Sequence, residues 1–137
     1  MIEIYTDGAY SSKRDQGGIG IAIVKDGNLV QSFSYPYINT TNIKMELIAV
    51  ITALNGINKS YEKVTIYTDS MYVIGCATKG WKRKKNVSLW KKYDEVFDKA
   101  NKFVSNGIHF IHVKGHANNK WNNLCDKLAV EASQLIL

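Results

Sequence analysis

Two short segments of the chain repeat one pattern of alternating apolar and polar residues. Residues 2–8 read Ile-Glu-Ile-Tyr-Thr-Asp-Gly, and residues 64–70 read Val-Thr-Ile-Tyr-Thr-Asp-Ser. Both are rich in β-branched and aromatic residues and both end in Thr-Asp plus a turn residue, which predicts two β-strands. If these strands are parallel neighbours, Asp7 and Asp69 lie together at the carboxyl edge of the sheet, where open α/β sheets place their ligands.

The chain between these two segments predicts a hairpin. Residues 9–16 are polar and are expected to form a loop, and residues 21–24 form an apolar strand. Asp26 and Gly27 suit a tight turn that needs positive φ, and residues 29–37 resume the strand pattern. The first three strands are therefore expected to form an antiparallel meander.

Three longer segments have a helical period. Helices are predicted over residues 43–57, 87–104 and 120–136, with Thr40, Thr41 and Asn42 as N-cap candidates for the first. A short helix is expected after Ser70, and a last strand over residues 108–113. This order of elements predicts an α/β fold, with a mixed sheet and helices packed on its faces.

Composition narrows the class of protein. A length of 137 residues with 45% apolar residues predicts a single domain over residues 1–137. The sequence contains neither a membrane span nor a secretory leader, so we expect a cytoplasmic protein that does not associate with membranes. Cys76 and Cys125 are expected to be reduced thiols, with a disulfide as the less favoured alternative. The size indicates a monomer.

Basic residues crowd into one segment. Between Ser70 and Tyr93 there is no acidic residue, and the net charge of the chain is +6. The basic residues of this segment are Lys79, Lys82, Arg83, Lys84, Lys85, Lys91 and Lys92. One interpretation is a solvated loop. The other is a phosphate-binding patch, because Trp81 and Trp90 are interleaved with the charges as in surfaces that bind nucleic-acid strands.

Two acids fall where apolar residues are expected. Glu46 shares a helical stripe with Val50 and Ala53, and Asp126 lies beside Cys125 at the edge of the stripe of the last predicted helix. Each has an ordinary explanation as an acid near a helix N-terminus, just as Asp7 and Asp69 could simply terminate strands.

Taken together, the four acids predict a metal site. Two aspartates at like ends of strands and two acids early in sheet-packing helices converge on one place, where like charges cannot all stay ionised without a cation. Carboxylate oxygens favour magnesium or manganese over zinc. A basic protein with acids at its centre also fits an arrangement in which two metal ions bridge protein carboxylates and a substrate phosphate.

The motifs resemble the type 1 ribonuclease H family. They are Tyr-Thr-Asp-Gly at 5–8, Thr-Thr-Asn at 40–42, Met-Glu-Leu at 45–47, Tyr-Thr-Asp-Ser at 67–70, Val-Lys-Gly-His-Ala at 113–117 and Cys-Asp-Lys-Leu-Ala at 125–129. The resemblance spans nearly the whole chain in order. It implies a ribonuclease H-like five-stranded sheet in which the two Tyr-Thr-Asp strands are adjacent and parallel.

The resemblance also implies an activity and its residues. Such enzymes cut the RNA strand of an RNA/DNA hybrid endonucleolytically, leaving 3′-hydroxyl and 5′-phosphate ends. Asp7, Glu46, Asp69 and Asp126 would hold two Mg²⁺ ions, with Mn²⁺ as a substitute, and His116 would assist proton transfer or product release. The expected substrate-binding residues are Gly8, Lys13, Thr41, Asn42, Ser70, Trp81, Lys82, Arg83, Lys84 and Lys85.

Three features depart from the family pattern. The 11–16 loop lacks the usual asparagine-proline-glycine run, so Lys13 stands where an amide usually contacts substrate. Met71 replaces a glutamine, and the segment 74–86 lacks a separate basic helix, which predicts weaker hybrid binding.

Two other functions remain open. One is a non-catalytic hybrid- or RNA-binding module, which retention of all four acids disfavours. The other is a transposase, integrase or junction-resolving nuclease of the same architecture, which the Met-Glu-Leu and Gly-His-Ala contexts disfavour.

Overall fold

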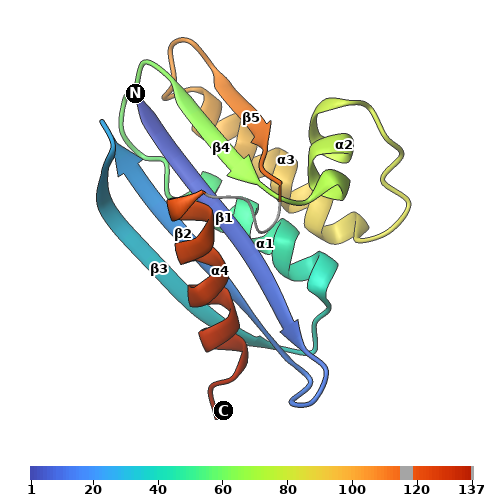
Figure 1. Ribbon diagram of the computed structural model, residues 1–137. Coiled ribbons are helices and arrows are strands. Elements are labelled where there is room, and N and C mark those ends of the chain that lie inside the picture. Colours follow the sequence, from blue (N-terminus) through green and yellow to red (C-terminus); the bar gives the residue numbers. More distant parts are fainter. Residues whose placement is uncertain (115–118, 137) are drawn as a thin grey trace.

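A five-stranded mixed sheet forms the centre of the protein in the computed structural model, which describes residues 1–114 and 119–136. Its strands are β1 (Ile2–Ser11), β2 (Gln16–Lys25), β3 (Asn28–Ile38), β4 (Val64–Thr68) and β5 (Ile108–His112). They lie in the order β3-β2-β1-β4-β5 (Figure 1). The pairs β1–β2 and β2–β3 are antiparallel, whereas β1–β4 and β4–β5 are parallel. The predicted meander with two added parallel strands is confirmed.

Helices cover both faces of this sheet, as predicted. They are α1 (Asn42–Asn55), α2 (Met71–Thr78), α3 (Val87–Asn101) and α4 (Lys120–Ser133). Successive residues of a strand face opposite sides, so Ile4 packs in the core formed with α1 and α3, while Tyr5 packs with Cys125 of α4. In Figure 1, α4 lies in front of the sheet and α1 and α3 lie behind it. The three longer helices end two or three residues earlier than their apolar periodicity predicted.

Strand β1 is longer than its sequence pattern predicted. Residues 9–11 belong to the strand, and the expected loop shrinks to residues 12–15. The reason is that β1 pairs with β2 as far as Ser11, opposite Gln16, whereas its pairing with β4 ends at Tyr5, opposite Tyr67. Asp7 therefore lies inside a strand, just beyond the point where β4 stops, and the antiparallel neighbour holds it in place.

Two glycines allow helices to pack closely against the sheet. A Cβ atom on Gly8 would clash with the backbone between Met45 and Glu46 of α1, and a Cβ on Gly20 would clash with the carbonyl of Cys125 in α4. Gly8 follows Asp7 in β1, and Gly20 is paired directly opposite Asp7 in β2. The sheet thus admits one helix on each face at the level of Asp7.

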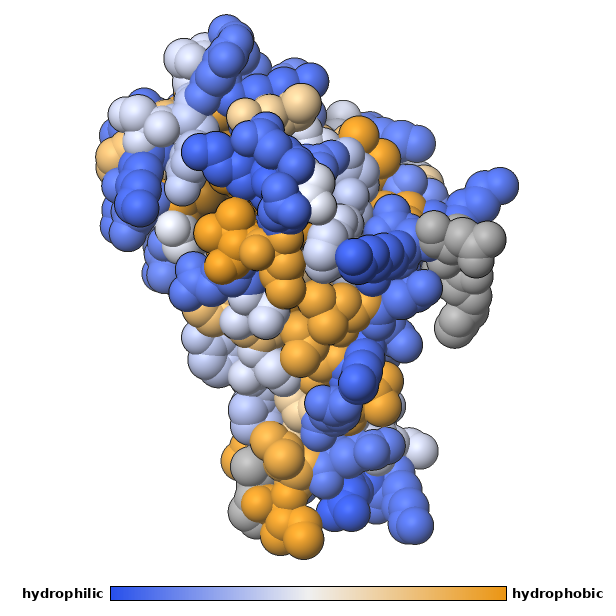
Figure 2. Space-filling view, turned by 60° about the vertical axis from the view of Figure 1, so that its left-hand side comes forward, coloured by the Kyte–Doolittle hydropathy of each residue, from blue (hydrophilic) through white to orange (hydrophobic). Residues whose placement is uncertain are grey.

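Strand β3 forms one edge of the sheet and carries exposed aliphatic side chains. Leu29, Val30 and Ile38 are each more than two-fifths exposed. Figure 2 brings this side of the molecule forward and shows apolar side chains among hydrophilic ones. The monomeric state expected from the sequence therefore stays a prediction.

Two further observations concern the cysteines and the lengths of the helices. Cys76 and Cys125 are both buried and free. Across residues 1–114 and 119–136, no helix has the length and apolar character needed to cross a membrane.

Candidate active site

Four carboxylates from four elements line one pocket of about 150 Å³. They are Asp7 of β1, Glu46 of α1, Asp69 directly after β4 and Asp126 of α4. Gly8, Asn42, Asn122 and Asn123 complete the lining. The convergence that the sequence predicted is present. It brings together Asp7 and Asp126, which are 119 positions apart in the chain.

The first turns of α1 place Glu46. The hydroxyl of Thr41 accepts a hydrogen bond from the backbone N–H of Lys44 at 3.2 Å and so caps the helix. Because Gly8 has no side chain, this end of α1 can lie directly against β1. The side-chain amide of Asn42 then donates to Glu46 Oε1 at 3.3 Å and holds the carboxylate toward the pocket.

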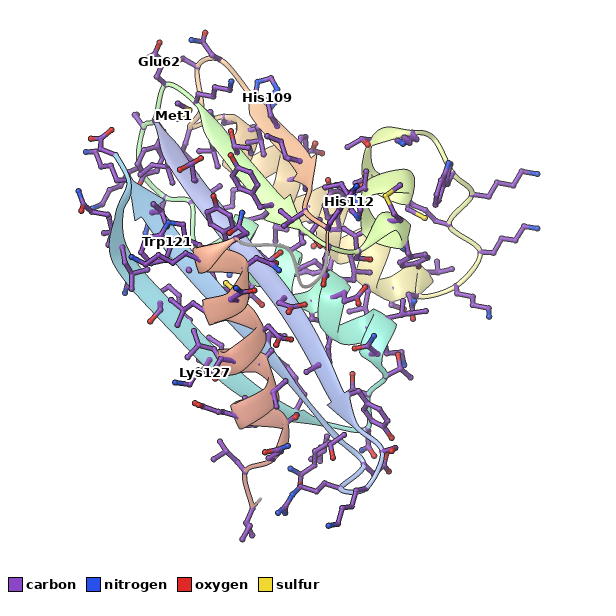
Figure 3. All side chains as sticks on the ribbon, in the orientation of Figure 1. Met1, Glu62, His109, His112, Trp121 and Lys127 are labelled. Carbon is purple, nitrogen blue, oxygen red and sulfur yellow. The ribbon has the colours of Figure 1, made fainter. Side chains whose placement is uncertain are left out.

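The end of β4 places Asp69. Ser70 caps α2 by accepting a hydrogen bond from the N–H of Val73 at 3.1 Å, and its own N–H donates to Thr68 Oγ1 at 3.1 Å. On the neighbouring strand, His112 Nε2 lies 3.1 Å from the carbonyl oxygen of Asp69. Figure 3 shows His112 where β5 ends, close to the start of α2. The backbone that carries Asp69 is therefore fixed on both sides.

Burial and mutual repulsion raise the pKa values of three of the acids. Asp7 is only 5% exposed. Burial, followed by the negative charges of Asp69 and Asp126, raises its pKa to about 8, although the N–H of Gly8 donates to Asp7 Oδ1 at 2.9 Å and opposes the shift. Burial is also the main reason that the pKa values of Glu46 and Asp69 are raised. The pocket therefore disfavours its own full ionisation.

These properties fit a bound divalent cation. The donors are oxygen atoms of carboxylates and amides, which suit hard cations such as magnesium. One oxygen, Asp69 Oδ1, is buried without a hydrogen-bond partner, and such a group calls for a ligand. Within residues 1–114 and 119–136, however, no group of three acidic, histidine or cysteine side chains is close enough together to hold a metal ion. Metal binding by the four acids stays a prediction on this geometry.

Some site residues were missed by the sequence argument. Asn122 and Asn123 lie one turn before Asp126 on α4 and line the pocket. The side chain of Asn119 caps this helix by accepting from the N–H groups of Trp121 and Asn122. The signal was the asparagine spacing of three and four residues before Asp126, which places those side chains on one helix face. His116 lies outside the described residues.

The predicted substrate-binding residues separate into three groups. Gly8 and Asn42 line the pocket itself, while Thr41 and Ser70 cap the adjoining helices α1 and α2. Lys13 is exposed in the turn between β1 and β2. The remaining five, Trp81, Lys82, Arg83, Lys84 and Lys85, lie in the segment between α2 and α3. Their roles toward substrate stay predictions.

The segment between α2 and α3 is basic, and one of its cations is engaged within the protein. Lys82, Lys84 and Lys85 are exposed, and we refer to them as the loop lysines. In Figure 3, long side chains with nitrogen tips project outward from this segment. Arg83 is instead paired with Asp94 of α3. Met71, the departure from the family pattern beside Ser70, is 39% exposed.

Comparisons with known proteins agree with this geometry. The family model described as RNase H matches residues 1–134. A ribonuclease H of Trichodesmium erythraeum is 38% identical over 144 residues, which cover 97% of this chain and 88% of that protein.

Solved structures show the same fold. RNase H1 from the halophilic archaeon Halobacterium salinarum superposes with a TM-score of 0.76 at 24% identity, covering 96% of each chain. LC11-RNase H1, solved in complex with an RNA/DNA hybrid, gives a TM-score of 0.74 at 24% identity, covering 96% of this chain and 99% of that one. With its four-acid pocket, its sheet order and the family match over nearly its whole length, the chain belongs to the ribonuclease H family.

Proposed function

We propose that the protein hydrolyses the RNA strand of RNA/DNA hybrids endonucleolytically, leaving 3′-hydroxyl and 5′-phosphate ends. The observation that carries this function is the single pocket in which Asp7, Glu46, Asp69 and Asp126 meet. Membership of the ribonuclease H family supports it, as does a structural neighbour that was solved with an RNA/DNA hybrid. A hydrolase that acts on a phosphodiester needs a site that can stabilise the negative charge developing on the scissile phosphate.

The four carboxylates would hold two Mg²⁺ ions, with Mn²⁺ as a substitute. When bound, such ions lower the pKa of an attacking water and stabilise the leaving oxygen. Asp7, the most buried of these four acids, has a pKa raised by burial and repulsion, so it would ionise more readily beside a bound cation whose positive charge offsets both. Asn42 keeps Glu46 turned toward the pocket, and His112 keeps the backbone at Asp69 in place.

His116 has the role that the family resemblance implies, assistance in proton transfer or product release. Its sequence position is ten residues before Asp126. An imidazole suits this task because its ordinary pKa lies close to neutral pH.

Cationic groups outside the acidic pocket would hold the substrate strands. The loop lysines supply positive charge, and Trp81 is 47% exposed next to them. A second hollow of about 400 Å³ is lined by Thr40, Lys44 and Asn86 and by the first residues of α3. A lysine beside a helix N-terminus favours a phosphate group. Discrimination of RNA from DNA would use the 2′-hydroxyl, read by polar groups along the minor groove.

The same proposal includes a single domain over residues 1–137 that acts as a monomer in the cytoplasm. The family match over residues 1–134 supports one domain. Size-exclusion chromatography with light scattering tests the monomer, because association through the exposed aliphatic side chains of β3 would double the measured mass.

Cleavage of labelled duplexes tests the function. RNA/DNA hybrid, double-stranded RNA and double-stranded DNA are incubated with Mg²⁺, Mn²⁺ or EDTA, and only the hybrid with a divalent ion should be cut. Asp69→Asn should abolish cutting while its circular dichroism spectrum stays that of the wild type. Cutting that survives EDTA, or near-normal activity of Asp69→Asn, contradicts the metal mechanism.

A non-catalytic hybrid-binding module is the second candidate, and the same assay separates it. Such a module would bind hybrid without cutting it. Such a module would bind phosphates more tightly without the four acids, since each carboxylate repels the nucleic-acid strand. Their presence in one pocket favours the enzyme.

A further inference from the structure

Arg83 differs from the basic residues around it in the contacts that it makes. Its Nη1 donates to both carboxylate oxygens of Asp94, at 2.8 and 2.9 Å. Its Nε donates to the carbonyl of Cys76 at 3.2 Å, and its guanidinium lies 4.5 Å from the ring centroid of Trp90. The three contacts reach α2 and α3 at once, so one side chain ties the segment between these helices to both of them.

The contact with Cys76 closes the end of α2. The last carbonyls of a helix have no partners within it and carry partial negative charge. Gly75 O accepts hydrogen bonds from the N–H groups of Lys79 and Trp81, and Cys76 O accepts from Arg83. A cation at this position is favoured by the helix dipole, which explains why an arginine here turns inward.

Two other anchors fix the same segment. The ring of Trp81 lies directly over Gly75, where any side chain would clash with it. The hydroxyl of Tyr72 accepts hydrogen bonds from Trp90 Nε1 at 2.9 Å and from Asn86 Nδ2 at 3.2 Å. These anchors lie at the two ends of the segment, and Arg83 is the contact in its middle.

The loop lysines lie on both sides of Arg83 in the sequence. All three are exposed, whereas the side chain of Arg83 is 29% exposed and its charge is offset by Asp94. Its Nε and Nη1 donors are engaged within the protein, which leaves this arginine less able than the loop lysines to contact a phosphate. Holding the backbone between the lysines reduces the ordering that must take place when they bind a strand.

We propose that Arg83 is a positioning residue: by clamping the segment between α2 and α3 onto Asp94 and Cys76, it presents the loop lysines as a preformed binding surface for the phosphates of the nucleic-acid substrate. This proposal rests on the proposed function for the identity of the substrate. It replaces the sequence expectation that Arg83 itself contacts substrate.

The substitution Asp94→Asn separates a clamp from a direct phosphate contact. It removes the partner of Arg83 and adds one positive charge to the protein. A direct contact would be freed, and KM for the hybrid would fall. A clamp would be loosened, and KM should rise by about 3- to 10-fold, the effect of having to order one or two side chains on binding, with kcat unchanged.

Asp98→Asn is the matched control. Asp98 is exposed on the same helix, and within the described residues it forms no ion pair. The charge change is the same, so KM should stay level or fall. Arg83→Gln should raise KM as Asp94→Asn does, and the double variant should be no worse than either single one, because both remove one interaction. A fall in KM for Asp94→Asn overturns the proposal.

Salt dependence gives a second readout. Each phosphate contact contributes about 0.7 to 0.9 to the slope of log affinity against log salt. Lys84→Gln should reduce the slope by about this amount, while Arg83→Gln should leave it unchanged. A reduction of the slope in Arg83→Gln equal to that in Lys84→Gln would show that Arg83 contacts a phosphate.

Digestion by a lysine-specific protease tests the clamp without using nuclease activity. Arg83→Gln and Asp94→Asn should be cut faster between α2 and α3 than wild type and Asp98→Asn, at temperatures well below unfolding. Equal cutting rates overturn the clamp. If the wild type cuts no hybrid at all, the proposed function and the substrate part of this inference both fail, and the protease result alone still decides whether Arg83 holds the segment.

Discussion

Replacing the buried acid Asp7 with asparagine should stabilise the metal-free protein while abolishing its activity. The side chain is 5% exposed, and its pKa rises from 3.8 to about 8 on folding. The folded state therefore binds a proton more tightly than the unfolded state does. This contribution to stability is fully present below about pH 4 and is lost as the pH rises through about 8.

The magnitude follows from the size of the shift. A change of roughly four pKa units, at about 1.4 kcal/mol each, sets a ceiling of about 6 kcal/mol at and above pH 8. Asparagine keeps the oxygen that accepts from Gly8, but its amide group must find a partner of its own. We therefore expect Asp7→Asn to raise the free energy of unfolding by about 2 to 4 kcal/mol near pH 8, with little gain near pH 4.

Denaturant unfolding in EDTA measures this difference. Wild type and Asp7→Asn are compared at about pH 4, 6 and 8, and the gap between them should widen as the pH rises. Asp126→Asn serves as the control, because Asp126 lines the same pocket but is exposed, so its gain should be smaller. Added Mg²⁺ should stabilise the wild type near pH 8 and should have little effect on Asp7→Asn.

A gap that is independent of pH would refute the reasoning, because burial and repulsion of an ionised Asp7 could then not be its origin. A loss of stability in Asp7→Asn would do the same. Either result would mean that the pocket accommodates the charged carboxylate without a cation.

The remaining predictions concern packing, capping and substrate binding. Gly8→Ala should destabilise the protein by about 1 to 3 kcal/mol and lower activity, because the new methyl group pushes α1 and Glu46 away from the sheet; thermal unfolding and cleavage rates measure this. Ser70→Ala should cost about 1 kcal/mol in denaturant unfolding, since it removes the cap of α2, with a further loss of activity at Asp69. Changing all three loop lysines to glutamine should raise KM for hybrid and flatten its salt dependence with kcat retained. An unchanged salt slope would mean that this segment is a solvated loop that does not bind phosphates.

Most helices and strands could be predicted from the local sequence pattern. The errors of that prediction lie at the ends of these elements. Residues 9–11 precede a polar stretch and were assigned with it to a loop, yet they continue β1 because β2 supplies a hydrogen-bonded partner as far as Gln16. Helices α1 and α3 end earlier than predicted because apolar periodicity reports burial and not helical hydrogen bonding: Ile57 and Val104 lie beyond these helices and are still buried in the core. Gly56 is the C-cap of α1.

The four acids that line the pocket could be predicted from the sequence, whereas some of the residues that hold them in place could not. Asp7, Glu46, Asp69 and Asp126 were found because acids interrupt apolar patterns. Asn122 and His112 were not predicted, because an amide or an imidazole interrupts an apolar pattern less clearly than a carboxylate does.

The sequence by itself selected the four acids that meet in one pocket of the folded protein. The repeat of Tyr-Thr-Asp, with acids on two apolar helix stripes, was enough to select the four carboxylates, because charge in an apolar pattern is a local property of the chain. Only the tertiary structure decided how those acids are held in place and which basic side chains are already paired within the protein. Gly8 proved to admit a helix, and Arg83 proved to be paired with Asp94. Both depend on contacts between segments distant in sequence, whose distances and burial no local pattern specifies.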